Sequence, residues 1–190
     1  MDTHQYVLEM VHRFNSLDLA HMEQDAYLAA KLFRLTRELH GLPQEYEELL
    51  TYAALLHDIG YFYGYAGHHK SAYRLIMESD IPGLSERERQ IVALVARYHR
   101  SARPKPKHKG FGDLVQEDRE IVTRLGAILR LADGLDRSHT NAVEDLECEI
   151  AGNHVILTLY PREGNEIERW AGQKKSRFFQ DVFGVTVEIR

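Results

Sequence analysis

The apolar residues of the first 140 positions recur at helical spacing, and this period constrains the fold more than any other feature of the chain. Leu28, Leu32 and Leu35 illustrate it within a predicted helix that Gly41 terminates. The pattern predicts helices over residues 4–15, 17–40, 43–60, 68–77, 85–98 and 117–135, with a loop over 101–113. We therefore expect the first 140 residues to form an all-helical body.

After Asn141 the apolar residues alternate instead. This alternation predicts strands over 146–151 and 155–160, joined by a tight turn at Gly152-Asn153. A helix over 164–183 and a third strand over 185–189 complete the chain. The expected fold is mainly α, with a helical bundle over residues 1–140 and a small C-terminal ββαβ unit over residues 141–190 packed on it.

Composition excludes several classes of protein. A formal charge of -5 over 190 residues argues against a general binder of nucleic-acid duplexes or membrane surfaces. The single cysteine, Cys148, excludes an internal disulfide framework and fits a reducing cytoplasm. No signal peptide opens the chain, and no apolar run approaches the roughly 20 residues that span a bilayer. We expect a cytoplasmic protein in which His4, His12 and His40 are solvated.

The stretch from Leu55 to Gly60 places His57 beside Asp58 at the end of an apolar helix. Adjacent His and Asp are poor core residues, but imidazole nitrogen and carboxylate oxygen together suit Zn, Mn or Fe(II). Two ligands do not complete a coordination sphere. The metal interpretation therefore depends on His and Asp residues in other segments.

Asp133 supplies such a residue near the end of the most apolar predicted helix. A buried carboxylate must be paired, hydrogen-bonded or bound to metal, because an isolated buried charge costs several kcal/mol. One interpretation is an ion pair with Arg130 or Arg137. Beside His21 and the His57-Asp58 pair, a shared metal site is the stronger interpretation.

These residues resemble the H…HD…D signature of the HD-domain superfamily of metal-dependent phosphohydrolases, whose fold is an all-helical bundle. His68 and His99 are placed like the additional ligands of binuclear members, although His69 is an alternative to His68. The resemblance implies one or two divalent ions (Mn, Fe, Zn, Ni, Co or Mg). The implied ligands are His21, His57, Asp58, His68, His99 and Asp133. His57, Asp58 and Asp133 are the expected catalytic residues, with Asp58 as the bridge between two ions.

A longer resemblance is to the C-terminal domain of the Ppx/GppA exopolyphosphatases. It rests above all on the stretch from Ile128 to His139, and also on His68-His69-Lys70, Ser79 to Gly83, Arg97 to Arg100, Glu168, Lys174-Lys175 and Phe178-Phe179. Those phosphatases hydrolyse polyphosphate and pentaphosphate in two N-terminal actin-like domains, which no segment of these 190 residues resembles. Their activity is therefore not implied for this chain.

Six cations follow one another without an intervening acid, at Arg97, Arg100, Arg103, Lys105, Lys107 and Lys109. The run is either a solvated loop or, beside a metal centre, a rim that gathers phosphate, which arginine can bind bidentately. The expected substrate contacts are Lys70, Arg97, Arg100, Arg103 and Arg137. His139 is expected to contact the same anion or to cap its helix, and Trp170 to serve packing rather than stacking.

Hypotheses of different class follow. The first is a metal-dependent phosphohydrolase that cleaves a phosphoester or phosphoanhydride of a nucleotide, alarmone or polyphosphate with a metal-activated water. The others are a non-catalytic module that binds polyphosphate or nucleotides, and a di-iron oxygenase. The complete His/Asp set favours the phosphohydrolase. Its partner would be a phosphorylated small molecule or polyphosphate, not a nucleic-acid duplex or a membrane, and a homodimer is compatible with the sequence.

Overall fold

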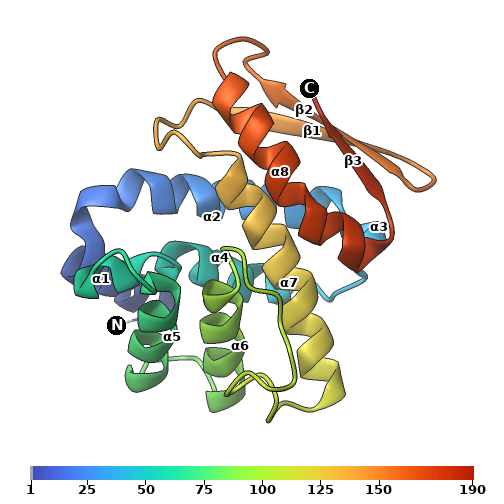
Figure 1. Ribbon diagram of the computed structural model, residues 1–190. Helices are drawn as coiled ribbons and strands as arrows, with labels where there is room; N and C mark the ends of the chain where they lie inside the picture. Colours follow the sequence, from blue (N-terminus) through green and yellow to red (C-terminus); the bar gives the residue numbers. More distant parts are fainter. Residues whose placement is uncertain (1) are drawn as a thin grey trace.

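Residues 2–190, which the computed structural model describes, form eight α-helices, two short 3-10 helices and three strands (Figure 1). In chain order these are α1 (Thr3–Asn15), η1 (Ser16–Asp18), α2 (Leu19–Leu35), α3 (Arg37–His40), α4 (Tyr46–Leu56), η2 (Ile59–Tyr63), α5 (His68–Glu78), α6 (Glu86–Arg97), α7 (Gln116–Gly134), β1 (Asp145–Ala151), β2 (His154–Tyr160), α8 (Glu166–Phe183) and β3 (Thr186–Ile189). The mainly helical fold with a terminal ββαβ order is thus confirmed. None of the helices within residues 2–190 has the length and apolar character needed to cross a membrane.

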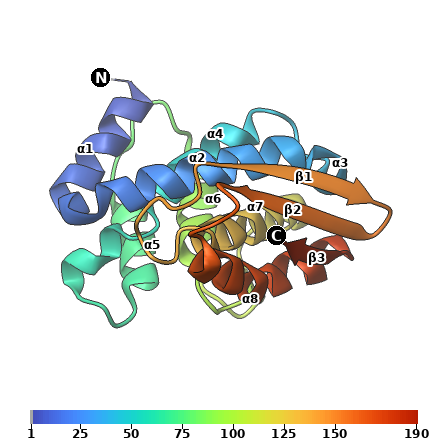
Figure 2. The same ribbon diagram turned by 90° about the horizontal axis from the view of Figure 1, so that it is seen from above.

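The helices surround a single hydrophobic core. α5, α6 and α7 lie side by side, and α8 packs along the second half of α7 (Figure 1). α2 crosses behind them, where it contacts α4, α7 and β1, and the view from above shows β1 running beside α2 (Figure 2). The ends of several helices therefore meet in the middle of the molecule.

The sheet has the order β1-β2-β3, with β2 antiparallel to β1 and parallel to β3. Val155, Leu157 and Leu159 alternate along β2 and are buried in the same hydrophobic cluster as the helices. This is the period-2 pattern of a strand with one covered face. One core thus includes residues on both sides of position 140, and the division into two units at that position stays a prediction.

Several predicted helix boundaries are wrong. The helix predicted over 17–40 is interrupted at Thr36, whose hydroxyl and N–H both donate to the carbonyl oxygen of Leu32, at 2.7 and 2.9 Å. Pro43 opens a turn rather than a helix, since α4 begins at Tyr46. The capping box of Ser85 and Glu88 at the start of α6 is present.

His40 is buried, which corrects the expectation that it is solvated. Its Nε2 atom donates to the carbonyl oxygen of Phe33 at 2.8 Å, and its Nδ1 atom accepts from the N–H of Leu42 at 3.0 Å. Burial lowers the pKa of His40. The neutral ring thus connects the end of α2 to the chain that leaves α3.

We expect His40→Ala to lower the free energy of unfolding by about 2–3 kcal/mol near neutral pH, because two buried backbone groups lose their partners. Since the pKa of His40 is lower in the folded state, the unfolded chain takes up its proton first as pH falls below about 6.5. The stabilisation is therefore present above that pH and lost below it. Urea unfolding at several pH values should show the gap between wild type and variant closing on acidification; a constant gap would contradict this assignment.

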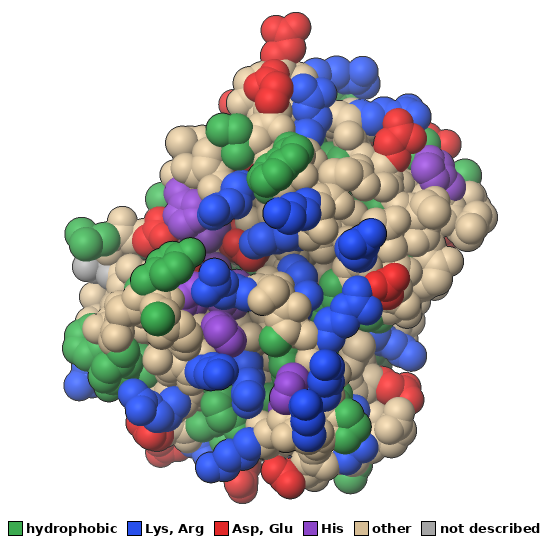
Figure 3. Space-filling model, in the orientation of Figure 1, with side chains coloured by type: hydrophobic (Ala, Val, Ile, Leu, Met, Phe, Trp, Pro, Cys, Tyr) green, Lys and Arg blue, Asp and Glu red, His purple; other side chains and the backbone are tan. Residues whose placement is uncertain are grey.

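Basic side chains gather on one face of this acidic protein, which Figure 3 shows in the orientation of Figure 1. Lysine and arginine side chains form a band across this face, and histidines lie among them. α8 and the loop between α6 and α7 contribute many of them. The negative formal charge is thus unevenly distributed.

Candidate metal centre

His57 and Asp58 lie in the turn that follows α4, because α4 ends at Leu56 and not at Gly60 as predicted. The carbonyl oxygen of Asp58 accepts hydrogen bonds from the N–H of Tyr61 and the side-chain amide of Asn15, both at 3.1 Å. A Cβ atom at Gly60 would collide with the carbonyl oxygen of His68, at the start of α5. Glycine at this position therefore lets α5 begin directly against the turn.

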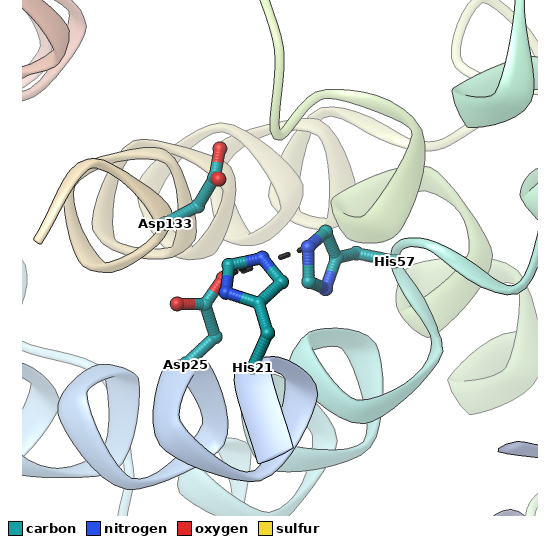
Figure 4. A group of neighbouring side chains, drawn as sticks. All are labelled: His21, Asp25, His57 and Asp133. Atoms are coloured by element: carbon teal, nitrogen blue, oxygen red, sulfur yellow. Dashed lines mark ion pairs between the residues drawn. The ribbon is translucent and has the colours of Figure 1, made fainter. Parts of the chain in front are cut away.

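Four side chains from three separate elements face a common space (Figure 4). α2 supplies His21 and Asp25, the turn after α4 supplies His57, and α7 supplies Asp133, with one ligand atom of each within 4.8 Å of the others. Asp25 Oδ2 lies 3.6 Å from His21 Nε2 and 3.5 Å from His57 Nε2. The structure thus adds Asp25 to the predicted residues; its signal in the sequence is its position four residues after His21, on the same helix face.

A second group lies beside the first and shares His57 with it. Ligand atoms of His57, Asp58 and His99 also lie within 4.8 Å of one another. Asp58 Oδ1 is 3.2 Å from His68 Nε2 and 3.5 Å from His99 Nε2, while Asp58 Oδ2 is 3.5 Å from His57 Nε2. The structure therefore brings all six predicted ligands together, with His57 shared by the two groups and Asp58 beside His57, His68 and His99. Of the two neighbouring histidines, His68 is the one beside Asp58.

All four histidines of the two groups are oriented in the same way. In each ring Nδ1 faces an oxygen atom outside the centre, at 2.6–3.0 Å: Asp136 Oδ2 for His21, and the carbonyl oxygens of Ala54, Tyr65 and Ala96 for His57, His68 and His99. Each Nε2 faces inward. Outer partners of this kind fix the tautomer of metal-binding histidines.

Several buried atoms of this cluster have no hydrogen-bond partner among the described residues: His21 Nε2, both carboxylate oxygens of Asp25, His57 Nε2 and Asp58 Oδ1. In addition, His68 Nε2 and His99 Nε2 face each other at 3.3 Å, although neutral rings that donate through Nδ1 carry lone pairs on Nε2. Buried polar atoms are rarely left unpaired. Inward-facing nitrogen and carboxylate lone pairs are the donor set of a divalent transition-metal ion, so the residues fit such a group.

Several side chains of the cluster have strongly shifted pKa values. Burial alone would raise the pKa of Asp58, but His57, His68 and His99 hold this pKa far below its usual value. Burial lowers the pKa of His57, and it lowers that of His99 to about 3, so both rings are neutral. Burial raises the pKa of Asp25 well above its usual value. In the metal-free centre, the ionised carboxylate of Asp58 thus lies beside the neutral rings of His57 and His99.

His21 differs because it faces carboxylates on both sides. Burial opposes its charged form, but Asp25 and Asp136 raise its pKa to about 9. The other oxygen of Asp136 accepts from the N–H of Asn141 at 2.9 Å. Asp136 therefore connects His21 to the turn after α7, a role that the sequence analysis did not assign.

Asp133 pairs with Lys175 of α8 rather than with Arg130 or Arg137, the partners considered from the sequence. Burial opposes ionisation, but Lys175 holds the pKa of Asp133 at about 2. The contact depends on close packing of α7 and α8, since a Cβ atom at Gly134 would lie 3.1 Å from the Cα atom of Gly172. One carboxylate oxygen of Asp133 is therefore engaged by a cation from α8.

A cavity of about 490 Å³ opens directly over the centre. Asp58, His68, His99 and Asp133 are among its lining residues. Cationic side chains from the loop after α6, from α7 and its following turn, and from α8 complete the lining; they are Arg100, Arg103, Arg130, Arg137, Lys174, Lys175 and Arg177. A volume of this size accommodates a small organic phosphate.

The predicted substrate contacts divide into two sets. Arg100, Arg103 and Arg137 line the cavity, whereas Lys70 and Arg97 are not among its lining residues. Arg97 instead donates to the carbonyl oxygen of Lys109 at 3.0 Å. Of the six cations in the run over 97–109, two thus face the cavity, while α8 supplies three that were not predicted as contacts.

His139 and Trp170 also line the cavity. His139 stacks on His21 with ring centroids 3.6 Å apart, and its Nδ1 atom lies 3.0 Å from a carboxylate oxygen of Asp18. Trp170 is 64% exposed and lines the cavity, so the expectation that it serves packing is wrong. A larger hollow of about 950 Å³ near Cys148 has no histidine among its described lining residues.

The fold and the site define a mainly helical domain with a buried His/Asp centre beneath a cation-lined cavity. The chain matches the family described as Ppx/GppA phosphatase, domain III, over residues 4–167, and it belongs to this family. It is 31% identical over 96 residues to a guanosine-5'-triphosphate,3'-diphosphate pyrophosphatase from Pseudoalteromonas translucida (strain TAC 125). That match covers 50% of this chain and 18% of the relative.

Proposed function

We propose that this domain is an HD-type, metal-dependent phosphohydrolase that cleaves a phosphoester or phosphoanhydride bond. The observation that carries the proposal is the set of buried, unpartnered donor atoms of His21, Asp25, His57 and Asp58, next to a cation-lined cavity that Asp58 itself lines. Such a set suits a divalent ion, and the cations suit a phosphate anion. Family membership and the pyrophosphatase name of the relative favour the same class of substrate.

The ligands would be His21, Asp25, His57 and Asp133 in one group and Asp58, His68 and His99 in the other. Divalent ions held there would supply a Lewis acid that activates water and polarises a phosphoryl oxygen. The chain's own contribution is to orient the ligands. Asp136 and the carbonyl oxygens of Ala54, Tyr65 and Ala96 hold each imidazole with Nε2 toward the centre.

The cations of the cavity would bind and orient the phosphate. Arg100 and Arg103 come from the segment after α6, where Arg103 also pairs with Asp181 of α8, and Lys174 and Arg177 come from α8. Arg103, Lys174 and Arg177 are exposed and Arg100 is partly exposed, so their attraction for an anion would act mainly on encounter and positioning and would weaken with salt. Lys175 is already engaged by Asp133, so it would fix the position of this ligand and partly neutralise its charge.

The proposal is tested by elemental analysis of the purified protein, followed by phosphate-release assays with Mn, Fe, Co, Ni, Zn and Mg. Substrates would include a phosphomonoester, nucleoside triphosphates and inorganic polyphosphate. We expect bound transition metal, loss of phosphate release after chelation, and recovery when one of these ions is returned. Tight phosphate binding without release in any metal would favour the non-catalytic binding module instead.

We expect His68→Ala and His99→Ala each to reduce bound metal from about two ions to about one per chain, because both rings serve the group centred on Asp58. Turnover should fall by more than tenfold, with little change in melting temperature. His12→Ala is the matched control, since His12 is exposed on α1. Unchanged stoichiometry in both variants would leave a single-ion site formed by the first group.

A further inference from the structure

Trp170 is the only tryptophan in the chain, and it lies at the cavity with its side chain largely in solvent. Tryptophan is usually well buried, so exposure of 64% beside a charged cavity is unusual. The Nζ atom of Lys174 lies 5.1 Å from the centroid of the Trp170 ring. An aromatic surface and a cation are therefore presented together.

Helical geometry places this pair in line with the proposed site. Trp170, Lys174 and Arg177 follow one another at i, i+4 and i+7 on α8, so they share the face that lines the cavity. Lys175, which contacts Asp133, lies five residues after Trp170, or about 7.5 Å along the helix axis. The cavity thus runs from carboxylate and imidazole ligands, past cations, to an exposed indole ring.

A second aromatic and cation pair also lines the cavity, on the wall formed by the segments that follow α4 and α6. Tyr65 is 67% exposed, and the guanidinium of Arg100 lies 5.4 Å from its ring centroid. Tyr61, on the same wall, stacks on the predicted ligand His68 with ring centroids 4.1 Å apart. Inorganic polyphosphate, which has no aromatic part, would use the cations and leave these surfaces uncovered.

We propose that Trp170 is a specificity-determining residue that stacks on the base of a nucleoside phosphate whose phosphates face the His/Asp centre. This inference rests on the phosphohydrolase function proposed above and names its substrate class. A nucleotide matches the arrangement because a sugar separates its planar base from its phosphates. Stacking of a base on an aromatic side chain tolerates any base, since every base has a π-face.

The test uses the fluorescence of Trp170 as an internal reporter of the wild-type protein. The probes are the non-hydrolysable analogues AMP-PNP and GMP-PNP, and inorganic tripolyphosphate as a base-free anion, all with Mg²⁺. We expect saturable quenching by at least one nucleotide analogue. Tripolyphosphate should displace the analogue and restore the fluorescence without quenching it directly.

Calorimetric titration of variants then separates base from phosphate. We expect Trp170→Ala to raise the dissociation constant of the nucleotide analogue about tenfold, within the range that loss of one stacked base causes. The constant for tripolyphosphate should stay within about twofold, because the cations are intact. Ile167→Ala is the control, since Ile167 is 56% exposed on the same helix and is not among the lining residues of the cavity.

Equal weakening of both probes, or no change in either, would overturn the role of Trp170, as would failure of both nucleotide analogues to bind. Metal-dependent hydrolysis with either result would leave the proposed function standing without base recognition. Conversely, selective nucleotide binding with no phosphate release in any metal would retain the stacking role and reject the hydrolase.

Discussion

Asp58→Ala is expected to remove at least one of the two proposed divalent ions and to reduce phosphate release by more than a hundredfold. Three other proposed ligands lie beside Asp58. The Nε2 atoms of His57, His68 and His99 are all within 3.5 Å of one of its two carboxylate oxygens. Loss of an outer partner alone typically costs about 10–100-fold in metal affinity or activity, so loss of this central ligand should exceed that range. Metal content by elemental analysis and phosphate release on the best substrate would measure both effects.

The variant should remain folded, which separates loss of the site from loss of the protein. The histidines lower the pKa of Asp58 in the folded state, so its charge stabilises the metal-free protein above about pH 4 and ceases to do so as pH falls further. We therefore expect a moderately lower melting temperature at neutral pH and an unchanged helical circular dichroism spectrum. Asp80→Ala is the matched control, because Asp80 is exposed in the turn after α5. Unchanged metal content in Asp58→Ala would show that the centre is placed wrongly.

The sequence was sufficient for the fold because local periodicity and core packing agree along most of the chain. Leu28 and Leu32 of α2 are fully buried, as their spacing predicts, and so are Val155, Leu157 and Leu159 of β2. Errors occurred where a side chain satisfies the backbone locally. The side chains of Thr36 and His40 both form hydrogen bonds with nearby backbone groups. The spacing of apolar residues cannot predict such hydrogen bonds.

The predicted ligands could be found from the sequence because they are histidines and aspartates at the ends of otherwise apolar helices. His57, Asp58, His99 and Asp133 all lie at or near a helix C-terminus, where a buried polar side chain needs a specific partner. Their convergence in space follows from helices whose ends meet. Their role as metal ligands stays a prediction until the metal content is measured.

Asp25 and Lys175 were missed for different physical reasons. An acid in the middle of a helix is usually solvated, so Asp25 gave no indication of complete burial beyond its spacing from His21. Lys175 is 42 residues from Asp133, and their contact depends on the close approach of α7 and α8 at Gly134 and Gly172. Packing of this kind depends on two glycines whose proximity cannot be inferred from either helix alone.

Arg130→Met is expected to destabilise the protein by about 3 kcal/mol and to weaken phosphate binding. Arg130 is a buried side chain of α7 that donates to the carbonyl oxygens of Tyr98, Ser101 and Ala102, in the segment after α6. Its guanidinium also lies 4.4 Å from the ring centroid of Phe178. Each carbonyl left without this charged donor costs about 1–3 kcal/mol, although those near the surface regain water.

The same substitution should affect the cavity because Arg130 holds the segment that presents Arg100 and Arg103. We expect the Michaelis constant to rise about tenfold and kcat to change less, since removal of uniform binding acts on KM alone. Urea unfolding without substrate and steady-state kinetics would measure the two effects separately. Burial lowers the pKa of Arg130 to about 10, so it remains charged throughout the neutral range in which these measurements are made.

Two matched variants distinguish the structural role of Arg130 from a simple charge in the cavity. Arg130→Lys keeps a cation, but a lysine side chain cannot donate to several carbonyl oxygens through one planar group. Its free energy of unfolding should therefore fall by most of the amount expected for Arg130→Met. Arg137→Met removes an exposed cation that lines the same cavity and has no hydrogen bond to the described loop, so it should raise KM without lowering stability. If lysine restored full stability, or if Arg137→Met destabilised the protein as much as Arg130→Met, the carbonyl contacts would not be what holds this segment over the centre.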